Sequence, residues 1–585
     1  MKSIPRILRF LQPYRVLIVF SLLALGVTIA CDLALPRLVQ TIVDQGIKAR
    51  DLPAILRIAA IMVGITAVSA VGAVINMTLA IRISQHASTD IRRELFGHIQ
   101  TLSYGDLDRL QTGNLITRLT SDITQVNQLI LQTMRMFVRA PLMLLGSVIL
   151  LVITNWQLAL MMFIIVPTAI GILVLYANKA QPLFLKVQRQ MDRLNTILQE
   201  NLSGVRVVKA FAREAFEDER FAVANTGLMT QAIRVGRLLA LILPVMRFLI
   251  NVGILTVVWY GGSMVIGGKL TVGEIIAFNN YVYSVMMPIN LLGMAVGSIS
   301  AADASAQRIL EVIDTRPEIA NAPAAQPLPD TPSRLAYEDV SFTYNGTEQE
   351  PVLTGINLAI EPGEMVAILG ATGSGKSTLI NLLPRYYDVT SGRVTISDTD
   401  VRTATLESVR SRYGSVPQDS VLFSLSIRDN IRYGRPDADD EDVMAAAQVA
   451  QAHDFILALP RGYDTLLSER GVNLSGGQKQ RLAIARAVLL QPEVLLMDDC
   501  ISAVDVETAS HILDGLDEAM AGHTRIVVAQ RISTALNANR IVVMDGGRVV
   551  ASGTHPELYA TSPLYREIYQ SQLGLDEEGG AVYEH

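Results

Sequence analysis

Long apolar runs dominate the first half of the chain. Runs long enough to cross a hydrocarbon core, which takes roughly 20 residues, lie near residues 16–38, 55–78, 137–155, 157–176, 239–260 and 275–298. The pattern predicts a membrane domain of six helices over residues 1–315. Apolar sequence continues to Val39 and further runs follow, so we expect an uncleaved first helix rather than a signal peptide.

Basic residues gather on one side of these runs. Residues 1–15, 82–139 and 179–237 carry 4, 7 and 10 Lys plus Arg, whereas the connections between them are sparse in positive charge. Since positive charge marks the cytoplasmic side, both ends of the membrane domain, and the N-terminus, should face the cytoplasm.

The two long basic segments carry a helical pattern. In residues 82–110, Ile91, Leu95 and Ile99 recur at spacings of four, and 179–237 is similar. About 25 residues of helix reach roughly 35–40 Å, so these cytoplasmic extensions would project well beyond the bilayer. They would transmit force or signal to a soluble domain, or merely solvate the helix ends; periodicity does not decide between the two.

A proline-rich segment divides the chain into two parts. Five prolines lie between Arg316 and Arg334, and proline blocks helix continuation, so we expect a linker over 316–334. Beyond it, β-type runs alternate with helical stretches, which is typical of a layered α/β domain. We place this domain at 335–572, with a tail over 573–585.

Composition agrees with a membrane protein that has a soluble portion. Half of the 585 residues are hydrophobic and the net charge is −6, which gives no reason to expect a nucleic acid as partner. The two cysteines, Cys31 and Cys500, provide neither a disulfide framework nor a zinc site. A reduced, cytoplasmic setting for the soluble part follows.

The sharpest chemical motif is GATGSGKST, which follows the strand-like MVAIL and precedes the apolar LINLL. This is the setting of a phosphate-binding loop, in which backbone N–H groups and a helix N-terminus face phosphate oxygens. Lys376 would place its charge on the β- and γ-phosphates, and Ser377 would offer its hydroxyl to Mg²⁺. The nucleotide-binding candidates here are Gly370, Thr372, Gly373, Ser374, Gly375, Lys376, Ser377 and Thr378. The predicted fold class is a membrane all-α domain followed by an α/β P-loop nucleotide-binding domain.

Two further segments carry candidate chemistry. The apolar run Val494–Met497 ends in neighbouring acids, Asp498 and Asp499, as a buried strand does when it delivers carboxylates to a reaction site. Residues 473–487 read NLSGGQKQRLAIARA, a helix start suited to an anion. Taken alone, this second segment would equally be an ordinary helix cap.

These three segments recur, in this order and spacing, in the ATP-binding cassette (ABC) proteins. With the six apolar runs, the whole chain resembles a half-transporter of the exporter type, similar to bacterial multidrug and lipid exporters. The resemblance implies ATP and Mg²⁺ as cofactors and hydrolysis coupled to the export of amphipathic small molecules or lipids. It also implies a place in the bacterial cytoplasmic (inner) membrane. A soluble cassette ATPase would lack the apolar runs.

The resemblance assigns roles to matching positions. Tyr344 would stack on the adenine ring, and Asp505 lies in the loop that crosses between two sites. The signature that contacts the ATP of the opposite subunit would be Ser475, Gly476, Gly477 and Gln478. The metal-site residues would be Ser377, Gln418 and Asp498. The segments 105–113 and 207–221 match regions that dock on nucleotide-binding domains.

Two positions depart from the family pattern. Asp499 stands where members that hydrolyse ATP well have a glutamate that polarises the attacking water, and it is one methylene shorter. Misplacement by about 1 Å can slow a reaction ~10²-fold. Gln530 replaces the switch histidine with a neutral amide that cannot relay a proton. Together these catalytic candidates predict a site that binds ATP and hydrolyses it poorly.

A weakened site beside an intact signature favours a heterodimer. A second ABC half-transporter subunit would supply the missing glutamate and histidine, completed by the LSGGQ of this chain. A slow homodimeric exporter and an ATP-binding regulatory membrane protein without transport remain as alternatives.

Polar residues within the runs are candidates for the cargo path, because charge in a membrane usually faces a cavity or a partner. They are Asp32, Asn76, Arg139, Arg247, Asn279, Asn280 and Asn290. For Asp32 we favour a structural pair with Arg37 at the outer rim. No residue identifies the cargo.

Overall fold

The computed structural model describes residues 3–344 and 350–573, apart from the side chains of residues 287 and 289–296. The chain divides into two compact units. The first comprises Met1–Gln100 and Gly113–Thr315, and the second comprises Thr101–Thr112 and Arg316–His585. Of the predicted tail over 573–585, residues 574–585 lie outside the described part of the chain.

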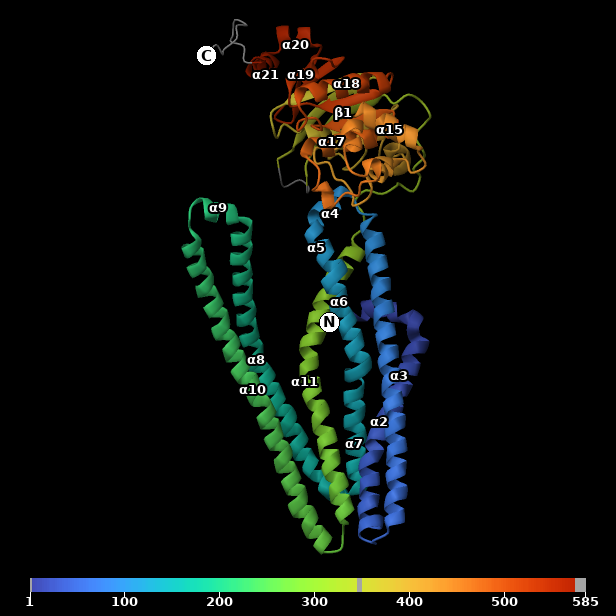
Figure 1. Cartoon of the computed structure of the whole chain (residues 1–585), viewed down its shortest axis with the longest axis vertical. Coiled ribbons are helices and arrows are strands. Elements are labelled where there is room, and N and C mark those ends of the chain that lie inside the picture. Colours follow the sequence, from blue (N-terminus) through green and yellow to red (C-terminus); the bar gives the residue numbers. More distant parts are fainter. Residues whose placement is uncertain (1–2, 345–349, 574–585) are drawn as a thin grey trace. The chain divides into compact units, whose positions relative to one another are not determined.

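The described residues of the first unit form helices joined by short turns (Figure 1). The α-helices are α1 Ile4–Ile7, α2 Arg15–Thr41, α3 Leu52–Ile99, α5 Thr112–Thr117, α6 Ile123–Gln132, α7 Arg139–Thr154, α8 Trp156–Ser203, α9 Val205–Ala210, α10 Glu214–Ile266 and α11 Val272–Asp314. Tighter or wider helical turns lie at η1 Leu8–Tyr14, η2 Ile42–Ile47, η3 Arg118–Asp122 and η4 Thr133–Phe137.

Helices long and apolar enough to cross a membrane occupy most of this unit. Among the described residues there are five: Ile4–Ile47, Leu52–Ile99, Thr112–Thr154, Trp156–Ser203 and Glu214–Ile266. They contain the first five predicted runs, except for Asn155 at the end of the third. The sixth run, 275–298, lies in the continuous helix α11, which includes the side chains that are not described. The number six therefore stays a prediction.

Helix α3 carries the predicted apolar stripe beyond the membrane run. Ile91 and Leu95 are completely buried, and the 48 residues of α3 span about 70 Å at 1.5 Å per residue. The helix ends at Ile99, however, instead of continuing to residue 110. A new helix begins because Ser103 caps it, accepting a hydrogen bond from the backbone N–H of Asp106 at 3.2 Å.

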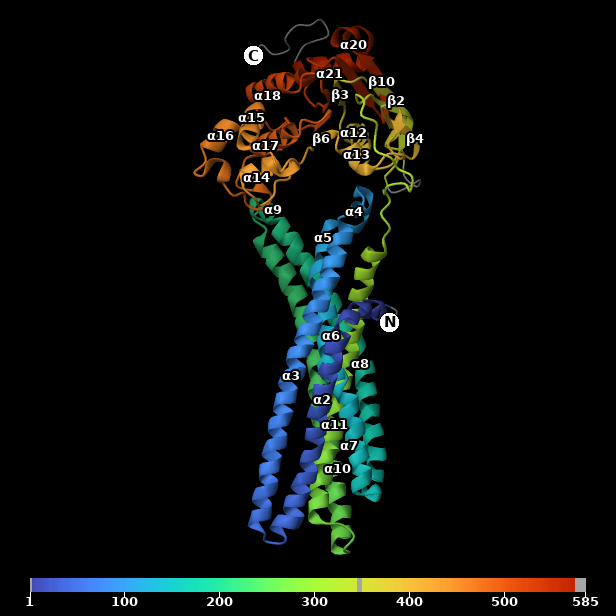
Figure 2. The same cartoon turned by 90° about the vertical axis from the view of Figure 1, so that its right-hand side faces the viewer.

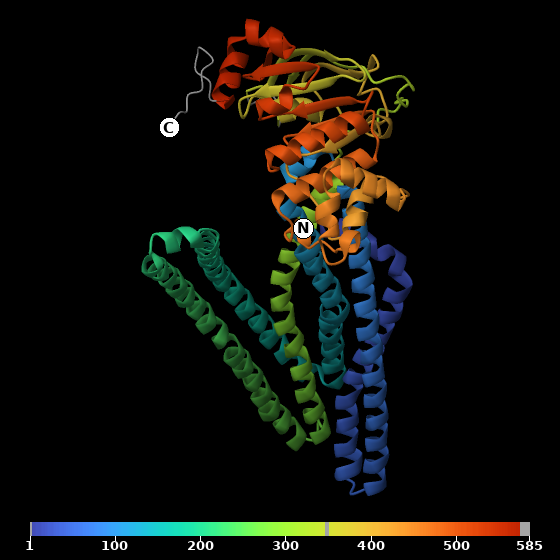
Figure 3. The ribbon, with the colours of Figure 1, turned by 45° about the horizontal axis from the view of Figure 1, so that its top comes forward.

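Helices α8 and α10 form a long hairpin closed by the short α9 (Figures 1 and 3). At one end the hairpin packs with α7 and α11 in a core that includes Leu158 and Val257. Towards α9 it diverges from the rest of the first unit, with Leu194 and Ile197 buried between its own two helices. Phe211, directly after α9, is 73% exposed, so this end of the hairpin presents apolar surface.

One expected pair inside the membrane domain is wrong. Asp32 does not pair with Arg37; its carboxylate accepts a hydrogen bond from Arg139 at 2.8 Å, and Arg37 donates to Gln40 at 3.0 Å. Residues five apart lie about 140° apart around a helix, so they do not share a face. The partner of Asp32 comes from the neighbouring helix α7 instead.

The second unit contains two sheets (Figure 2). The strand orders are β2-β1-β4-β5 and β10-β9-β3-β8-β7-β6. The strands are β1 Leu335–Phe342, β2 Leu353–Ile360, β3 Met365–Gly370, β4 Ser391–Ile396, β5 Thr399–Asp400, β6 Tyr413–Val416, β7 Val494–Asp498, β8 Thr524–Val528, β9 Arg540–Asp545 and β10 Arg548–Gly553.

Helices and helical turns complete this unit. The α-helices are α4 Tyr104–Leu110, α12 Lys376–Leu382, α13 Leu406–Arg410, α14 Ile427–Ile431, α15 Asp440–Val449, α16 His453–Leu457, α17 Gly476–Leu489, α18 Val506–Ala519, α19 Ile532–Ala535, α20 His555–Thr561 and α21 Pro563–Leu573. The turns are η5 Arg432–Gly434, η6 Gly462–Asp464 and η7 Glu469–Gly471.

The larger sheet is parallel except for its edge strand β10. Strands β3 and β7 are buried along almost their whole length, which is why their sequences read as unbroken apolar runs. Because parallel strands end at the same edge of a sheet, the segments after β3, β8, β7 and β6 meet there. This edge carries the motifs of the sequence analysis.

The proline-rich segment 316–334 contains no helix or strand and lies against the second unit. The carbonyl of Pro329 accepts a hydrogen bond from Arg412 at 2.6 Å. The backbone N–H of Gln326 donates to Thr403 at 3.2 Å, and Leu328 is only 8% exposed. The segment is therefore a packed arm of this unit rather than a free tether.

Candidate functional site

The phosphate loop lies between β3 and α12, as its sequence predicts. Gly370 and Gly375 adopt φ values of 153° and 94°, conformations that favour glycine. A Cβ on Gly370 would lie 2.2 Å from the carbonyl oxygen of Met544, so no side chain fits there. Thr372 and Gly373 form the exposed turn of the loop, and Gly375 leads directly into α12.

The side chains of this loop fit a phosphate ligand. The ammonium of Lys376 donates to the carbonyl oxygens of Gly370 and Ala371, both at 2.8 Å, and its burial lowers its pKa. The hydroxyl of Ser374 is buried and has no hydrogen-bond partner among the described residues. Buried polar groups are normally satisfied, so a ligand oxygen would complete Ser374 and give Lys376 a stronger partner.

A carboxylate and a hydroxyl meet beside the loop. Ser377, in the first turn of α12, donates to Asp498 at the end of β7 over 3.0 Å. In the described part of the chain, no three His, Cys, Asp or Glu side chains cluster as metal ligands. Mg²⁺ is commonly held by one or two protein oxygens together with phosphate oxygens and water, so this pair fits Mg²⁺ bound with a nucleotide. Gln418, exposed two residues after β6, lies at the same sheet edge.

The two residues that depart from the family pattern touch each other. The amide of Gln530, which follows β8, donates to the carboxylate of Asp499, which follows the neighbouring β7, over 2.7 Å. Asp499 is 8% exposed and has φ 48°. Burial raises the pKa of the carboxyls of both Asp499 and Asp498. A cavity of about 140 Å³ adjoins both Asp499 and Gln530.

Two residues outside the predicted set hold Gln530 in place. The side-chain amide of Gln572, in α21, donates to the carbonyl oxygen of Gln530 and accepts from the backbone N–H of Ile532, both at 2.7 Å. Arg531 donates to the carbonyl oxygen of Ser502 at 3.1 Å. No sequence motif singles out Gln572 or Arg531, and their roles emerge only from the folded chain.

Tyr344 lies close to the phosphate loop. Its hydroxyl is 3.0 Å from that of Thr378, and its ring stands edge-on to those of Phe342 and Tyr387. This places the aromatic candidate for adenine stacking within hydrogen-bond distance of the helix that follows the loop.

The signature segment forms a self-contained helix cap. Ser475 accepts from the backbone N–H of Gln478 at 3.3 Å, and the Gln478 amide oxygen accepts from the N–H of Ser475 at 2.9 Å. Ser475 and Gly476 are exposed at the start of α17, and a Cβ on Gly477 would lie 2.9 Å from the Ala503 carbonyl. The result is an exposed helix N-terminus suited to an anion.

Asp505 caps the next helix, α18. Its carboxylate accepts from the backbone N–H of Thr508 at 2.9 Å, which lowers its pKa. The structure thus joins the phosphate loop, Asp498, Asp499 and Gln530 into one site. Ser475, Gly476 and Asp505 are exposed in the same unit.

A docking segment completes the second unit. Helix α4, which overlaps the predicted segment 105–113, places a carboxylate oxygen of Asp108 2.8 Å from the hydroxyl of Tyr387. The ring of Tyr104 contacts that of Tyr386 in a tilted arrangement, with centroids 4.6 Å apart. Sequence reasoning missed Tyr386 and Tyr387, because nothing in RYYD marks them as contacts of a segment 279 residues away.

Comparisons with known proteins agree over almost the whole chain. Residues 16–289 match the family model described as the ABC transporter transmembrane region, and residues 353–502 match the model described as ABC transporter. The chain is 37% identical to YfiB of Bacillus subtilis, an uncharacterized ABC transporter ATP-binding protein, over 97% of this chain and 98% of that one. It is also 37% identical to an ATP-dependent lipid A-core flippase of Syntrophus aciditrophicus, over 86% and 83% of the two chains.

A solved structure shares the fold. A bacterial Atm1-family ABC exporter with ATP bound superposes with a TM-score of 0.80 at 29% identity, covering 95% of this chain and 98% of that one. This chain therefore belongs to the ABC transporter family, as an exporter half-transporter whose ATP-binding domain couples ATP hydrolysis to transport.

Proposed function

We propose that this chain is one subunit of a heterodimeric exporter of amphipathic small molecules or lipids, and that its own ATP site hydrolyses slowly. The observation that carries the proposal is the pairing of Asp499 with Gln530 in an otherwise complete nucleotide site. A relative named as a lipid A-core flippase supports a lipid among the possible cargoes.

The phosphate loop supplies binding. Backbone N–H groups at the start of α12, the hydroxyl of Ser374 and the charge of Lys376 face the place of the phosphates. Ser377, Asp498 and Gln418 would hold Mg²⁺, which neutralises charge on the phosphates when bound. Tyr344 would support the adenine ring. None of these positions is altered, so we expect ATP to bind in this pocket.

In this proposal, hydrolysis is slow because the Asp499 carboxylate does not reach far enough and because Gln530 cannot transfer a proton. It is not slow because Asp499 is a weak base. Burial already raises the pKa of Asp499, which favours proton acceptance. Its carboxylate is nevertheless one methylene shorter than a glutamate, and it is engaged by Gln530. The amide of Gln530 can donate a hydrogen bond but cannot carry a proton to a departing phosphate. Bound ATP would therefore persist in this site.

Two exposed surfaces of the chain are suited to contact a second subunit. The start of α17 is exposed, with its cap intact, and can face a nucleotide held elsewhere. The end of the α8–α10 hairpin carries exposed Phe211 and Val207, within the segment that resembles a docking region. A partner with glutamate and histidine at the positions of Asp499 and Gln530 would form the fast site with this chain's signature.

Transport by reconstituted protein tests the proposal. We expect ATP-driven flux of a fluorescent amphipath in proteoliposomes that hold this chain with the subunit that co-purifies with it, and little flux with this chain alone. Equal flux from the chain alone would support the slow homodimer. An absence of ATP-driven flux in either preparation would favour a regulatory ATP-binding membrane protein.

A further inference from the structure

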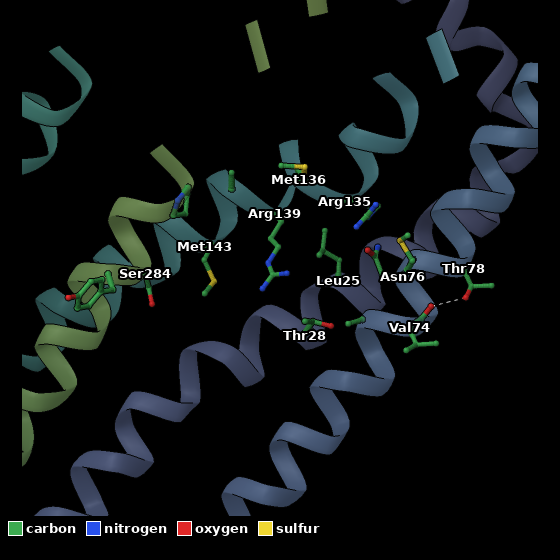
Figure 4. A pocket seen from close by; sticks show the side chains of 15 residues that line it. Leu25, Thr28, Val74, Asn76, Thr78, Arg135, Met136, Arg139, Met143 and Ser284 are labelled. Carbon is green, nitrogen blue, oxygen red and sulfur yellow. Dashed lines mark hydrogen bonds between the residues drawn. The ribbon is translucent and has the colours of Figure 1, made fainter. Parts of the chain in front are cut away.

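The first unit contains a pocket of about 740 Å³ between α2, α3, α7 and α11 (Figure 4). Much of its wall is apolar, with Leu25, Met136 and Met143 among the lining residues. The pocket is thus large enough for the apolar part of a lipid or a drug-sized molecule. The polar groups that line the pocket determine which kind of molecule it would bind.

Apart from Tyr283, the neutral polar side chains of the wall already use their protons inside the protein. The hydroxyls of Thr28, Thr78 and Ser284 each donate to the carbonyl oxygen one helical turn earlier, at 2.9–3.1 Å. The amide of Asn76 donates to the backbone and hydroxyl oxygens of Ser21, both at 3.0 Å. These groups offer a ligand few further hydrogen-bond donors.

Besides the hydroxyl of Tyr283, two guanidinium groups supply donors to the pocket. Arg135 and Arg139 are four residues apart, about one helical turn, and both line the pocket (Figure 4). Arg139 donates to Asp32 at 2.8 Å, whereas Arg135 has no carboxylate within 4.0 Å among the described residues. Among the described residues, the lining contains no acidic side chain. Counting Asp32 as the partner of Arg139, the pocket keeps one positive charge without a counter-ion.

Arg139 lies at the start of the membrane run 137–155, and Arg135 lies two residues before it. Charge is costly next to apolar membrane surroundings, so arginines that line an apolar cavity there mark a site for an opposite charge. We propose, building on the export function proposed above, that the pocket binds an acidic amphipath. Its phosphate or carboxylate head would bridge Arg135 and Arg139 through charge-assisted hydrogen bonds, and its apolar tail would lie against Met136, Met143 and Leu25. Cationic amphipaths would be repelled.

Binding to the purified complex, without ATP, tests this assignment. The probes are short-chain fluorescent phosphatidylglycerol and phosphatidylcholine with identical acyl chains. We expect the acidic probe to bind at least about tenfold more tightly, a typical effect of one charged hydrogen bond. Arg135→Gln should remove most of this preference. Arg135→Gln with Arg139→Gln and Asp32→Asn should remove all of it, since Asp32 is then not left as an unpaired charge.

Two controls distinguish binding of the acidic probe in the pocket from its general attraction to basic surface. Arg15→Gln, at the exposed start of α2 and outside the pocket lining, should keep the full preference. Inorganic phosphate at millimolar concentration should not displace the acidic probe if the tail contributes; displacement would identify a site for a free anion instead and overturn the proposal.

Two results would overturn the acidic assignment: equal binding of both probes by the native complex, or an unchanged preference in the triple variant. The export proposal is judged separately by ATP-driven flux. An acid preference that vanishes in the triple variant while no preparation shows flux would uphold the pocket assignment and reject export.

Discussion

At the residue scale, the proposed chemistry of the nucleotide site depends most on Asp499. Its backbone has φ 48°, a left-handed conformation that aspartate adopts more readily than most residues. Its carboxylate bonds Gln530, and its own carbonyl oxygen accepts from the hydroxyl of Ser502 at 2.9 Å. Asp499 is therefore held by hydrogen bonds at both its side chain and its backbone.

Lengthening this side chain should restore hydrolysis. We expect Asp499→Glu to raise the ATP turnover of this site about tenfold to a hundredfold, because the carboxylate gains roughly 1 Å of reach. The adjoining cavity of about 140 Å³ leaves room for the added methylene. Adding Gln530→His should raise turnover further by allowing proton transfer.

Phosphate release by the purified complex measures this effect. The matched control is Asp499→Asn, which keeps the size and the hydrogen-bond acceptor but removes the base, and which should lower any residual turnover of this site. If the Glu–His double variant hydrolyses ATP no faster than the native protein, the defect does not lie in these two residues.

Burial of the Asp499 carboxyl also predicts a pH-dependent stability. Its pKa is raised on folding, so the folded state favours the protonated form. The penalty for burying the charge is absent below the ordinary pKa and becomes complete as pH rises through the raised value. Asp499→Asn should therefore raise the thermal midpoint of the nucleotide-free protein at pH 7.5, with the gain shrinking toward pH 4. A gain that does not change with pH would contradict this cause.

At the element scale, helix α4 is connected to the nucleotide site by aromatic rings. Tyr387 donates to Asp108 of α4, and its ring stands edge-on to Tyr344 with centroids 5.2 Å apart. Burial raises the pKa of Tyr387, so its hydroxyl remains protonated and able to donate. A change at the adenine-side Tyr344 can thus reach α4 through a single intervening side chain.

Removing this hydroxyl should weaken coupling without weakening nucleotide binding. Tyr387→Phe keeps the ring and loses about 1 kcal/mol of hydrogen bonding, so we expect transport per ATP hydrolysed to fall about fivefold while the affinity for ATP is unchanged. Flux and phosphate release, measured together in proteoliposomes, give this ratio. Tyr559→Phe, on the distant α20, is the control. A parallel loss of ATP affinity would show that Tyr387 serves the nucleotide pocket instead.

Local pattern predicts much of this molecule. The phosphate loop, the buried β7 and the start of α17 lie where their sequences place them, since each depends on neighbouring residues. Contacts between distant segments were not predictable. Asp499 and Gln530 are 31 residues apart, and they meet only because β7 and β8 are neighbours in the sheet.

Two differences between expectation and structure have physical causes. The stripe after Ile91 ends at Ile99 because Ser103 offers a cap that outweighs the continuing apolar spacing. Asp32 pairs with Arg139, 107 residues away, because Arg37 lies on another face of its helix. Spacing along one helix predicts its faces, but it does not predict which neighbouring helix meets them.

At the scale of the whole molecule, the chain presents surfaces suited to contact a second subunit. The first unit carries apolar surface on the α8–α10 hairpin, and the second carries an exposed signature whose nucleotide would come from elsewhere. Two copies of this chain would combine two slow sites. Pairing with a subunit that carries glutamate and histidine would instead give one slow and one fast site.

Native mass spectrometry of the tagged chain, purified from its own membranes, tests this central claim most directly. We predict a 1:1 complex with a second chain of similar size that has glutamate and histidine at the positions matching Asp499 and Gln530. A complex of two identical chains would contradict the account, and Asp499 would then be the working catalytic base of both sites.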